Sequence, residues 1–188
     1  MPLFHSPNSL TCYPQFQMDN GGRIALTGFM GVGKSSVARH LSSIARCDRL
    51  DLDAFIEKNT RRTIAEIITN DGEPAYRIIE TENLVRALRE THARILSLGG
   101  GTWTIPKNRD LLSADRVTTV WLESSFEHCW TNISKSRKER PLAKNKQAAR
   151  QLFESRQSIY CLADWHFIVR PEFTSYEIAT QIAEQVFS

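Results

Sequence analysis

The sequence predicts an α/β domain built on a parallel sheet of about five strands that is flanked by helices. Short apolar runs alternate with helical patterns from Arg23 onward, which is typical of strand–helix–strand units. A glycine-rich loop separates the first run from a helical pattern. The final stretch carries Ile178, Ala179, Ile182 and Val186 at helical spacing, which predicts a closing helix packed on the sheet. The predicted strands are 24–27, 50–52, 95–98, 117–122 and 167–169.

The composition is that of an ordinary globular protein. The chain has 188 residues, of which 41% are hydrophobic and 24% are charged, and this suits one domain with a sizeable core. A net charge of +3 is too small to indicate nucleic-acid binding, but it suits an anionic ligand. No apolar run approaches the roughly 18 residues of a membrane helix. We therefore expect neither a nucleic-acid partner nor a membrane partner.

The cysteines and histidines predict neither a disulfide framework nor a zinc site. The four cysteines are scattered without a C-x-x-C pair, and the five histidines form no cluster. This pattern favours the reducing cytoplasm, and the first residues lack the regions of a secretory signal. We interpret residues 1–22, with three prolines, as a flexible extension before a domain over 23–188. Without a coiled-coil pattern, we expect a monomer.

Residues 28–35, GFMGVGKS, fill every fixed position of the phosphate-loop motif G-x-x-x-x-G-K-[ST], also called Walker A. They follow an apolar run and precede a helical pattern, which is the context that this motif requires. The glycines allow backbone N–H groups to turn toward phosphates at a helix N-terminus. Lys34 would reach the outer phosphates, and the Ser35 hydroxyl would help to hold Mg²⁺. The alternative is a glycine-rich turn before an ordinary helix.

Asp51 and Asp53 close the predicted second strand, where a spacing of two points both carboxylates the same way. In open parallel sheets, ligands bind at the carboxyl ends of the strands. One acid would assist Mg²⁺ through water, and the other would accept a hydroxyl proton. The alternative is that Asp53 only caps the following helix.

A helix-rich insertion is predicted from Asp53 to about residue 89. It contains Thr63-x-x-Glu66, a capping-box pattern that predicts the start of a helix. Residues 71–74, Asp-Gly-Glu-Pro, predict a break between two helices.

Arg77 and Glu80 lie three residues apart on the second of these helices, so their side chains can touch. A surface ion pair would explain the spacing and contribute little. The functional alternative has Glu80 holding the guanidinium for a bidentate grip on a substrate carboxylate.

Gly99, Gly100 and Gly101 directly follow the predicted third strand. Their backbone has no side chains in the way, so a polar ligand can approach the N–H groups. The alternative is a plain tight turn.

A second insertion, from about residue 135 to 150, is strongly basic. A solvated basic stretch is one interpretation; a mobile lid that closes over a nucleotide is the other, favoured by the phosphate loop. The basic residues are Lys135, Arg137, Lys138, Arg140, Lys144, Lys146 and Arg150.

Six segments, in order, carry a family resemblance over Arg23 to the C-terminus. They are GFMGVGKSS (28–36), DLDAFIE (51–57), DGEPAYRIIE (71–80), SLGGG (97–101), RPLA (140–143) and SRQSIYCLAD (155–164). Together they resemble the shikimate kinase family, a P-loop kinase of the nucleoside-monophosphate-kinase-like type. The resemblance implies transfer of the ATP γ-phosphoryl group to the 3-hydroxyl of shikimate, a step toward aromatic amino acids.

The resemblance also implies roles for residues of this chain. Catalysis would use Asp53, Lys34 and Arg140. Magnesium would be held by Ser35, with Asp51 helping through water. ATP would contact Gly31, Val32, Gly33, Lys34, Ser35, Ser36 and Arg140. Residues 53 to about 89 would be the substrate-binding segment, and shikimate would contact Asp53, Arg77, Gly100, Gly101 and Arg156.

Three alternatives stay open. Another small-molecule kinase of this fold, acting on gluconate or a nucleoside monophosphate, would differ at the acceptor site. A catalytically silent kinase-like module would not need Lys34, Ser35, Asp53 and Arg140. A nucleic-acid binder is the least favoured, because few aromatics interleave the basic stretch.

Overall fold

The fold is a five-stranded parallel sheet with helices on both faces, as a computed structural model describes it for residues 22–136 and 140–187. The strand order is β2-β3-β1-β4-β5, and every neighbouring pair is parallel, which confirms the predicted sheet. All five carboxyl ends therefore meet at one edge. The strands are β1 (Arg23–Thr27), β2 (Arg49–Asp51), β3 (Ile95–Ser97), β4 (Val117–Glu123) and β5 (Trp165–Ile168). The predicted N-terminal extension, except Gly22, lies outside the described residues.

Strand β5 begins two residues earlier than the apolar run predicts. It lies at the edge of the sheet and pairs only with β4 among the described strands. Its first residues, Trp165 and His166, are exposed, whereas Phe167 is buried. An edge strand can expose its side chains, so the apolar signal begins only at Phe167.

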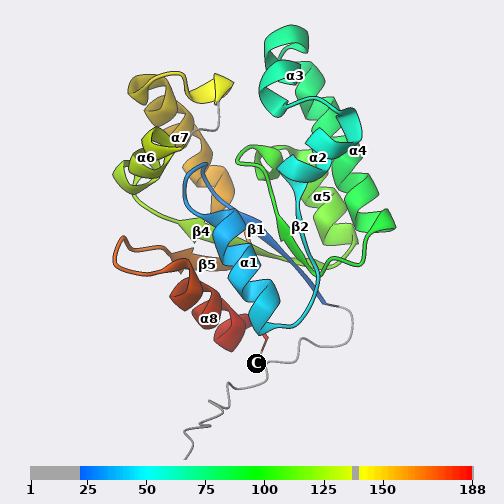
Figure 1. The fold of residues 1–188 in the computed structure, drawn as a ribbon. Helices are drawn as coiled ribbons and strands as arrows, with labels where there is room; N and C mark the ends of the chain where they lie inside the picture. The colour runs from blue at the N-terminus through cyan, green and yellow to red at the C-terminus, as the bar shows by residue number, and fades with distance from the viewer. Residues whose placement is uncertain (1–21, 137–139, 188) are drawn as a thin grey trace, which may run out of the picture.

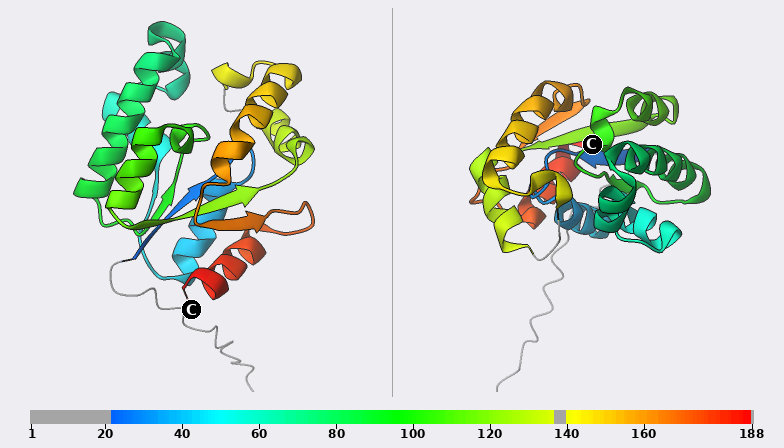
Figure 2. Two further views of the ribbon diagram at one scale, coloured as in Figure 1. Left: turned by 180° about the vertical axis from the view of Figure 1, so that it is seen from behind. Right: turned by 90° about the horizontal axis from the view of Figure 1, so that it is seen from above.

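Helices cover both faces of the sheet. Figures 1 and 2 show α1 and α8 on one face and α4 and α5 on the other. The sequence predicts that the last helix packs on the sheet, but its principal neighbour is α1. None of the described helices is long and apolar enough to span a bilayer. The helices are α1 (Lys34–Ile44), α2 (Leu52–Thr60), α3 (Ile64–Asp71), α4 (Glu73–Glu90), α5 (Pro106–Ala114), α6 (Phe126–Lys135), α7 (Lys146–Tyr160) and α8 (Ser175–Val186), with 3₁₀ turns η1 (Thr102–Thr104) and η2 (Pro141–Ala143).

The central strand β1 and helix α1 form the middle of one hydrophobic core. Ile24, Ala25 and Leu26 are all buried, because a central parallel strand is covered on both faces. Val37 and Leu41 of α1 are fully buried one helical turn apart. This packing fixes the loop between β1 and α1 at the carboxyl edge of the sheet.

The predicted insertion after β2 folds as α2, α3 and α4. Thr63 and Glu66 form the predicted capping box, in which the Glu66 N–H donates to Thr63 Oγ1 at 3.1 Å and the Thr63 N–H donates to Glu66 Oε2 at 2.7 Å. Gly72, with a φ of +87°, separates α3 from α4. The insertion rises on one side of the carboxyl edge, opposite α6 and α7 (Figure 1).

The predicted basic insertion, from about residue 135 to 150, includes the end of α6, a connecting segment and the start of α7. Helix α6 ends at Lys135 and α7 begins at Lys146, so residues 136–145 connect the two helices. Arg137 and Lys138 lie outside the described residues. Lys146 and Arg150 belong to α7, and both bind Glu127 at the start of α6, at 2.8 and 2.5 Å. Lys146 and Arg150 therefore form ion pairs with an acid, Glu127, that lies well before the basic stretch in the sequence.

Candidate active site

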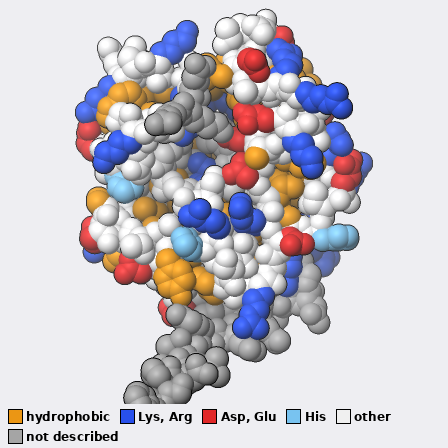
Figure 3. Space-filling model, viewed as in Figure 1, with side chains coloured by type: hydrophobic (Ala, Val, Ile, Leu, Met, Phe, Trp, Pro, Cys, Tyr) orange, Lys and Arg blue, Asp and Glu red, His pale blue; other side chains and the backbone are white. Residues whose placement is uncertain are grey.

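Two adjoining cavities open at the carboxyl edge of the sheet, between the α2–α4 insertion and the α6–α7 pair. The first encloses about 500 Å³ and the second about 320 Å³. Figure 3 shows acidic and basic side chains gathered around this hollow. Four residues line both cavities and so form their common wall: Met30, Asp53, Gly100 and Arg140.

The glycine-rich loop lines the first cavity. It joins β1 to α1, as predicted, and Gly33 caps α1 in a left-handed conformation with a φ of +102°. No side chain of the described residues caps this N-terminus, and the Ser36 N–H donates to the Gly33 carbonyl at 3.0 Å. The N–H groups of Lys34 and Ser35 at the start of the helix suit an anion. The lining includes all six predicted loop residues: Gly31, Val32, Gly33, Lys34, Ser35 and Ser36.

Gly31 connects the phosphate loop to α6. Its φ is +83°, and a Cβ there would lie 2.5 Å from the Cys129 carbonyl oxygen, so only glycine fits. Asn132 Nδ2 donates to the Gly31 carbonyl at 2.9 Å. Both contacts hold the loop against the helix that leads into the 136–145 connection.

Lys34 is buried in the first cavity beside the loop's own carbonyl groups. Its Nζ donates to the carbonyls of Gly28 at 2.8 Å and Phe29 at 3.0 Å. Burial lowers the pKa of Lys34 to about 8, partly opposed by the nearby negative charge of Asp53. The ammonium group therefore keeps its charge at neutral pH.

Asp51 and Asp53 line the first cavity from two different elements, whereas the sequence predicts both on one strand. Asp51 ends β2 and caps α2, since its Oδ1 accepts the Ala54 N–H at 3.3 Å. Asp53 is not on the strand but in the first turn of α2, so the predicted alternation of a strand does not apply to it. The cap role suggested for Asp53 belongs to Asp51. Both carboxylates nevertheless line the first cavity.

The side chains of Ser35 and Asp51 bring together two oxygen atoms that could bind a metal ion. The Ser35 hydroxyl donates to Asp51 Oδ2 at 2.5 Å and lies 3.4 Å from the Ser97 hydroxyl. The described residues contain no group of three or more His, Cys, Asp or Glu side chains suited to a metal ion. A few oxygen ligands beside a phosphate site fit Mg²⁺, which keeps waters and phosphate oxygens as ligands.

Arg140 lies just before η2 and lines both cavities. Its Nε is buried and has no hydrogen-bond partner within the described residues. Burial lowers the pKa of Arg140, and the charge of Asp53 opposes this shift. A half-buried guanidinium whose Nε has no partner within the described residues, at the common wall, is suited to an anion that spans the two cavities.

Arg77 lines the second cavity and is held by two carboxylates. Its Nη1 donates to Glu80 Oε2 at 2.8 Å, which confirms the predicted contact. Its Nε and Nη2 donate to Glu73 Oε1 at 3.1 and 2.7 Å. Glu80 is fully buried, so the pair is not the surface ion pair of the alternative interpretation.

The triple glycine contacts Arg77 and Arg156, and the sequence alone does not predict these contacts. A Cβ on Gly101 would lie 2.4 Å from Arg77 Nη2, so the guanidinium rests on the bare backbone. The Gly100 carbonyl accepts Arg156 Nη1 at 3.0 Å and also the Tyr160 hydroxyl. The hydrogen bonds of the described residues thus use carbonyls of this loop, and the predicted donation by its N–H groups to a ligand stays a prediction.

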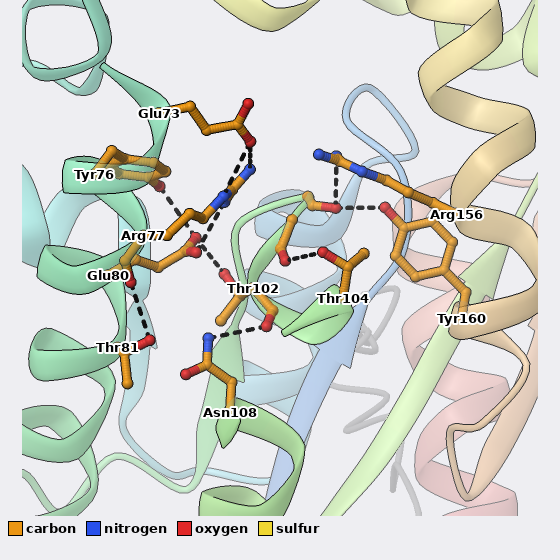
Figure 4. A network of polar contacts seen from close by, with 12 residues as sticks. Glu73, Tyr76, Arg77, Glu80, Thr81, Thr102, Thr104, Asn108, Arg156 and Tyr160 are labelled. Carbon is orange, nitrogen blue, oxygen red and sulfur yellow. Dashed lines mark hydrogen bonds and ion pairs between the residues drawn. The ribbon is translucent and has the colours of Figure 1, made fainter. Parts of the chain in front are cut away.

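Arg156 completes the basic side of the second cavity. It is 6% exposed and comes from α7, opposite Arg77 of α4 (Figure 4). The remaining wall is largely apolar and could pack against the carbon skeleton of a ligand. This apolar wall consists of Ile64, Ala65, Ile68, Pro141 and Leu142.

The first cavity extends beyond the phosphate loop to the segment between β5 and α8. Its walls there are Val169, Phe173, Ser175 and Ile178. His128 and Asn132 of α6 also line it. No local sequence pattern predicts this extension, because its residues come from α6, from α8 and from the segment between β5 and α8.

Comparisons with known proteins agree with this geometry. The family model described as shikimate kinase matches residues 30–187. A shikimate kinase of Lactococcus lactis subsp. cremoris is 38% identical over 164 residues, which cover 86% of this chain and 96% of the relative. A shikimate kinase of Prochlorococcus marinus is 32% identical over 172 residues, covering 89% and 85%.

A solved structure has the same fold over nearly the whole chain. The shikimate kinase from Acinetobacter baumannii in complex with shikimate superposes with a TM-score of 0.81 and 29% identity. The match covers 92% of this chain and 94% of that one. The predicted P-loop kinase fold is confirmed.

Proposed function

The chain belongs to the shikimate kinase family, and we propose that it transfers the γ-phosphoryl group of ATP to the 3-hydroxyl of shikimate. The product would be shikimate 3-phosphate, on the pathway through chorismate to aromatic amino acids. The observation that carries the proposal is the common wall: Asp53 and Arg140 line both the phosphate-loop cavity and the cavity of Arg77 and Arg156. A group moved between ligands in these cavities would pass these two side chains.

ATP would occupy the first cavity with its phosphates on the glycine-rich loop. The N–H groups of residues 31–36 and the α1 N-terminus would bind the phosphate oxygens. Lys34 would turn from the carbonyls of Gly28 and Phe29 to the outer phosphates. The nucleoside would extend toward Val169 and Phe173.

Magnesium fits beside Ser35 and Asp51. Ser35 would bind the ion directly and Asp51 through water, in line with their shared hydrogen bond. When bound, the ion supplies positive charge to the β- and γ-phosphate oxygens.

Shikimate would occupy the second cavity. Arg77 and Arg156 would bind its carboxylate from opposite sides, and Ile64, Ile68 and Leu142 would contact the carbon ring. This orientation would turn the ring hydroxyls toward Asp53, with N–H groups of Gly100 and Gly101 as further donors.

The transfer itself would need one base and several cations. Asp53 would orient the 3-hydroxyl and accept its proton while that oxygen attacks the γ-phosphorus. The bond from the γ-phosphorus to the β,γ-bridging oxygen breaks, and ADP leaves. Lys34 and Arg140 would stabilise the negative charge that spreads over the transferred group.

We also propose that the protein acts as a cytoplasmic monomer. The sequence contains no coiled-coil pattern that would predict self-association. The cysteines in the described part of the chain, Cys47, Cys129 and Cys161, are free thiols, which suits a reducing compartment.

Shikimate-dependent release of ADP tests the proposed reaction. Purified protein with ATP and Mg²⁺ would be assayed with shikimate, gluconate or a nucleoside monophosphate as the acceptor. The arginine pair favours a hydroxylated carboxylic acid over a nucleotide. Release with shikimate alone supports the proposal. Release only with another acceptor supports a different small-molecule kinase, and ATP binding without release supports the silent module.

A further inference from the structure

Glu80 lies at the centre of a buried network beside the acceptor cavity (Figure 4). Its Oε1 accepts hydrogen bonds from the Thr102 hydroxyl at 2.7 Å and the Tyr76 hydroxyl at 3.1 Å. Its Oε2 accepts Arg77 Nη1 at 2.8 Å. The two oxygens of the Glu80 carboxylate thus have different partners: Oε1 accepts hydrogen bonds from two hydroxyls, and Oε2 accepts one from the arginine.

These three hydrogen bonds fix the rotation of the Glu80 carboxylate. Two donors on Oε1 oppose rotation of the group, so Oε2 stays directed at Arg77. Burial and the charge of Glu80 raise the pKa of Tyr76 far above its usual value. The Tyr76 hydroxyl therefore stays protonated and acts as a donor to Glu80.

Thr102 is itself held in place by the triple-glycine loop. Its N–H donates to the Gly99 carbonyl at 3.1 Å, and its carbonyl accepts Asn108 Nδ2 at 3.0 Å. A Cβ on Gly99 would lie 2.9 Å from Thr102 Oγ1 and 3.0 Å from Glu80 Oε1. The loop thus approaches α4 closely at this point, and the hydroxyl of Thr102 reaches across to Glu80.

The network leaves Arg77 able to grip one more anion. A guanidinium has five N–H groups, and Glu73 and Glu80 accept three hydrogen bonds from Arg77. The hydrogen bonds given for the described residues leave one N–H on Nη1 and one on Nη2 for a planar carboxylate. The contacts with Glu73 and Glu80 fix the plane of the guanidinium, so the direction of these two N–H groups depends on the orientation of the Glu80 carboxylate.

We propose that Tyr76 and Thr102 are positioning residues, which act through Glu80 to direct Arg77 at the acceptor carboxylate. The inference rests on the proposed function, because it takes the acceptor to be a carboxylic acid. Neither hydroxyl needs to touch the acceptor. Their effect is confined to acceptor binding and does not extend to the phosphate loop.

Tyr76→Phe and Thr102→Val each remove one hydroxyl and keep the side-chain shape. We expect each to raise KM for shikimate about tenfold, the effect of loosening one charge-assisted hydrogen bond. The kcat and the KM for ATP should stay within about twofold, because Asp53 and Lys34 are untouched. A wild-type KM for shikimate in both folded variants would overturn the proposal.

Thr81→Val is the matched control. Thr81, in α4, is a buried threonine like Thr102 of η1. Its hydroxyl donates to the Arg77 main-chain carbonyl at 3.0 Å and not to Glu80. It should leave KM for shikimate unchanged. An equal rise in this control would show that loss of any buried hydroxyl here has the same effect, and would overturn the specific role of Tyr76 and Thr102.

A double-mutant cycle separates positioning from packing. If Tyr76 acts through Arg77, Tyr76→Phe should add less than about twofold to KM in an Arg77→Lys background. A full tenfold effect in that background would show that Tyr76 acts by another route and would overturn the proposal.

A measurement without substrate separates this proposal from the proposed function. Hydrogen exchange of the Arg77 Nη–H groups, one of which donates to Glu80, should quicken on the order of tenfold in the Tyr76→Phe/Thr102→Val double variant, as followed by NMR with the signals assigned from Arg77→Lys. The Arg77 Nε–H, which donates to Glu73, is the internal reference. Unchanged exchange would overturn the positioning role, even in an active enzyme. Wild-type protein without shikimate-dependent turnover would overturn the proposed function, and the exchange result would still decide the role of the two hydroxyls.

Discussion

The two cavities differ in how the chain builds them. The phosphate-loop cavity depends mainly on the backbone of eight consecutive residues, 28–35, which lead from the end of β1 into the first turn of α1. The acceptor cavity depends on side chains from α2, α3, α4 and α7, with the triple glycine between them. A backbone site is encoded by a short local motif, whereas a side-chain site requires the whole fold to bring its parts together.

The cations of the two cavities differ in the same way. Lys34 bonds to neutral carbonyls of its own loop. Arg77 is held by Glu73 and Glu80, so much of its charge is already balanced. From this difference we infer that Lys34 acts mainly through charge and Arg77 mainly through geometry. The predictions below test that contrast.

Lys34→Ala should have the largest effect. It removes the buried cation of the phosphate loop, so kcat should fall by about 1,000-fold or more. Steady-state ADP release measures it, with circular dichroism as the control for folding. Turnover near that of the wild type would show that the charge of Lys34 is not needed for the transfer.

Asp53→Asn tests the common wall. Loss of the carboxylate should lower kcat by on the order of 100-fold or more, while the Kd for ATP changes less than about threefold. Titration calorimetry with ATP provides the second value. Loss of ATP binding instead would place Asp53 on the nucleotide side of the site.

Arg77→Lys tests geometry against charge in the acceptor cavity. An ammonium keeps the charge but cannot form the planar fork, so KM for shikimate should rise about 30-fold. The KM for ATP should not change.

Gly101→Ala provides an independent check of the same contact. Its Cβ would displace the Arg77 guanidinium, since the two would lie 2.4 Å apart. We expect the same selective loss of shikimate binding. An unchanged KM for shikimate in both variants would remove Arg77 from the acceptor site.

The pH dependence should show the smallest effect. Because burial lowers the pKa of Lys34 to about 8, the free protein loses this charge as the pH rises through that value. The KM for ATP should therefore increase, by up to about tenfold between pH 7 and pH 9, while KM for shikimate stays constant. A flat KM for ATP over this range would mean that the pKa of Lys34 is not lowered.

The contrast between the cavities also explains what the sequence could predict. The phosphate loop, the five strands and the Arg77–Glu80 contact follow from local patterns, and the structure contains each of them. The helical position of Asp53 was missed because a three-residue strand runs directly into α2. Strand and helix periods cannot be separated over so few residues.

Contacts between distant residues were beyond local patterns. Arg156 and Tyr160 meet the Gly100 carbonyl, 56 and 60 residues away in the chain. Gly101 supports Arg77 because it lacks a side chain, and spacing alone does not reveal which group a glycine accommodates. Such contacts depend on the register of α4 and α7 against the sheet, which only the folded chain defines.

The identity of the phosphorylated product tests the central claim most directly. Protein, ATP, Mg²⁺ and shikimate would be incubated, and the products followed by ³¹P and ¹H NMR. We predict equal amounts of ADP and of shikimate phosphorylated at the 3-hydroxyl, with neither formed by Lys34→Ala. ADP without phosphorylated shikimate, or phosphate on another hydroxyl, would contradict the placement of the acceptor between Asp53, Arg77 and Arg156.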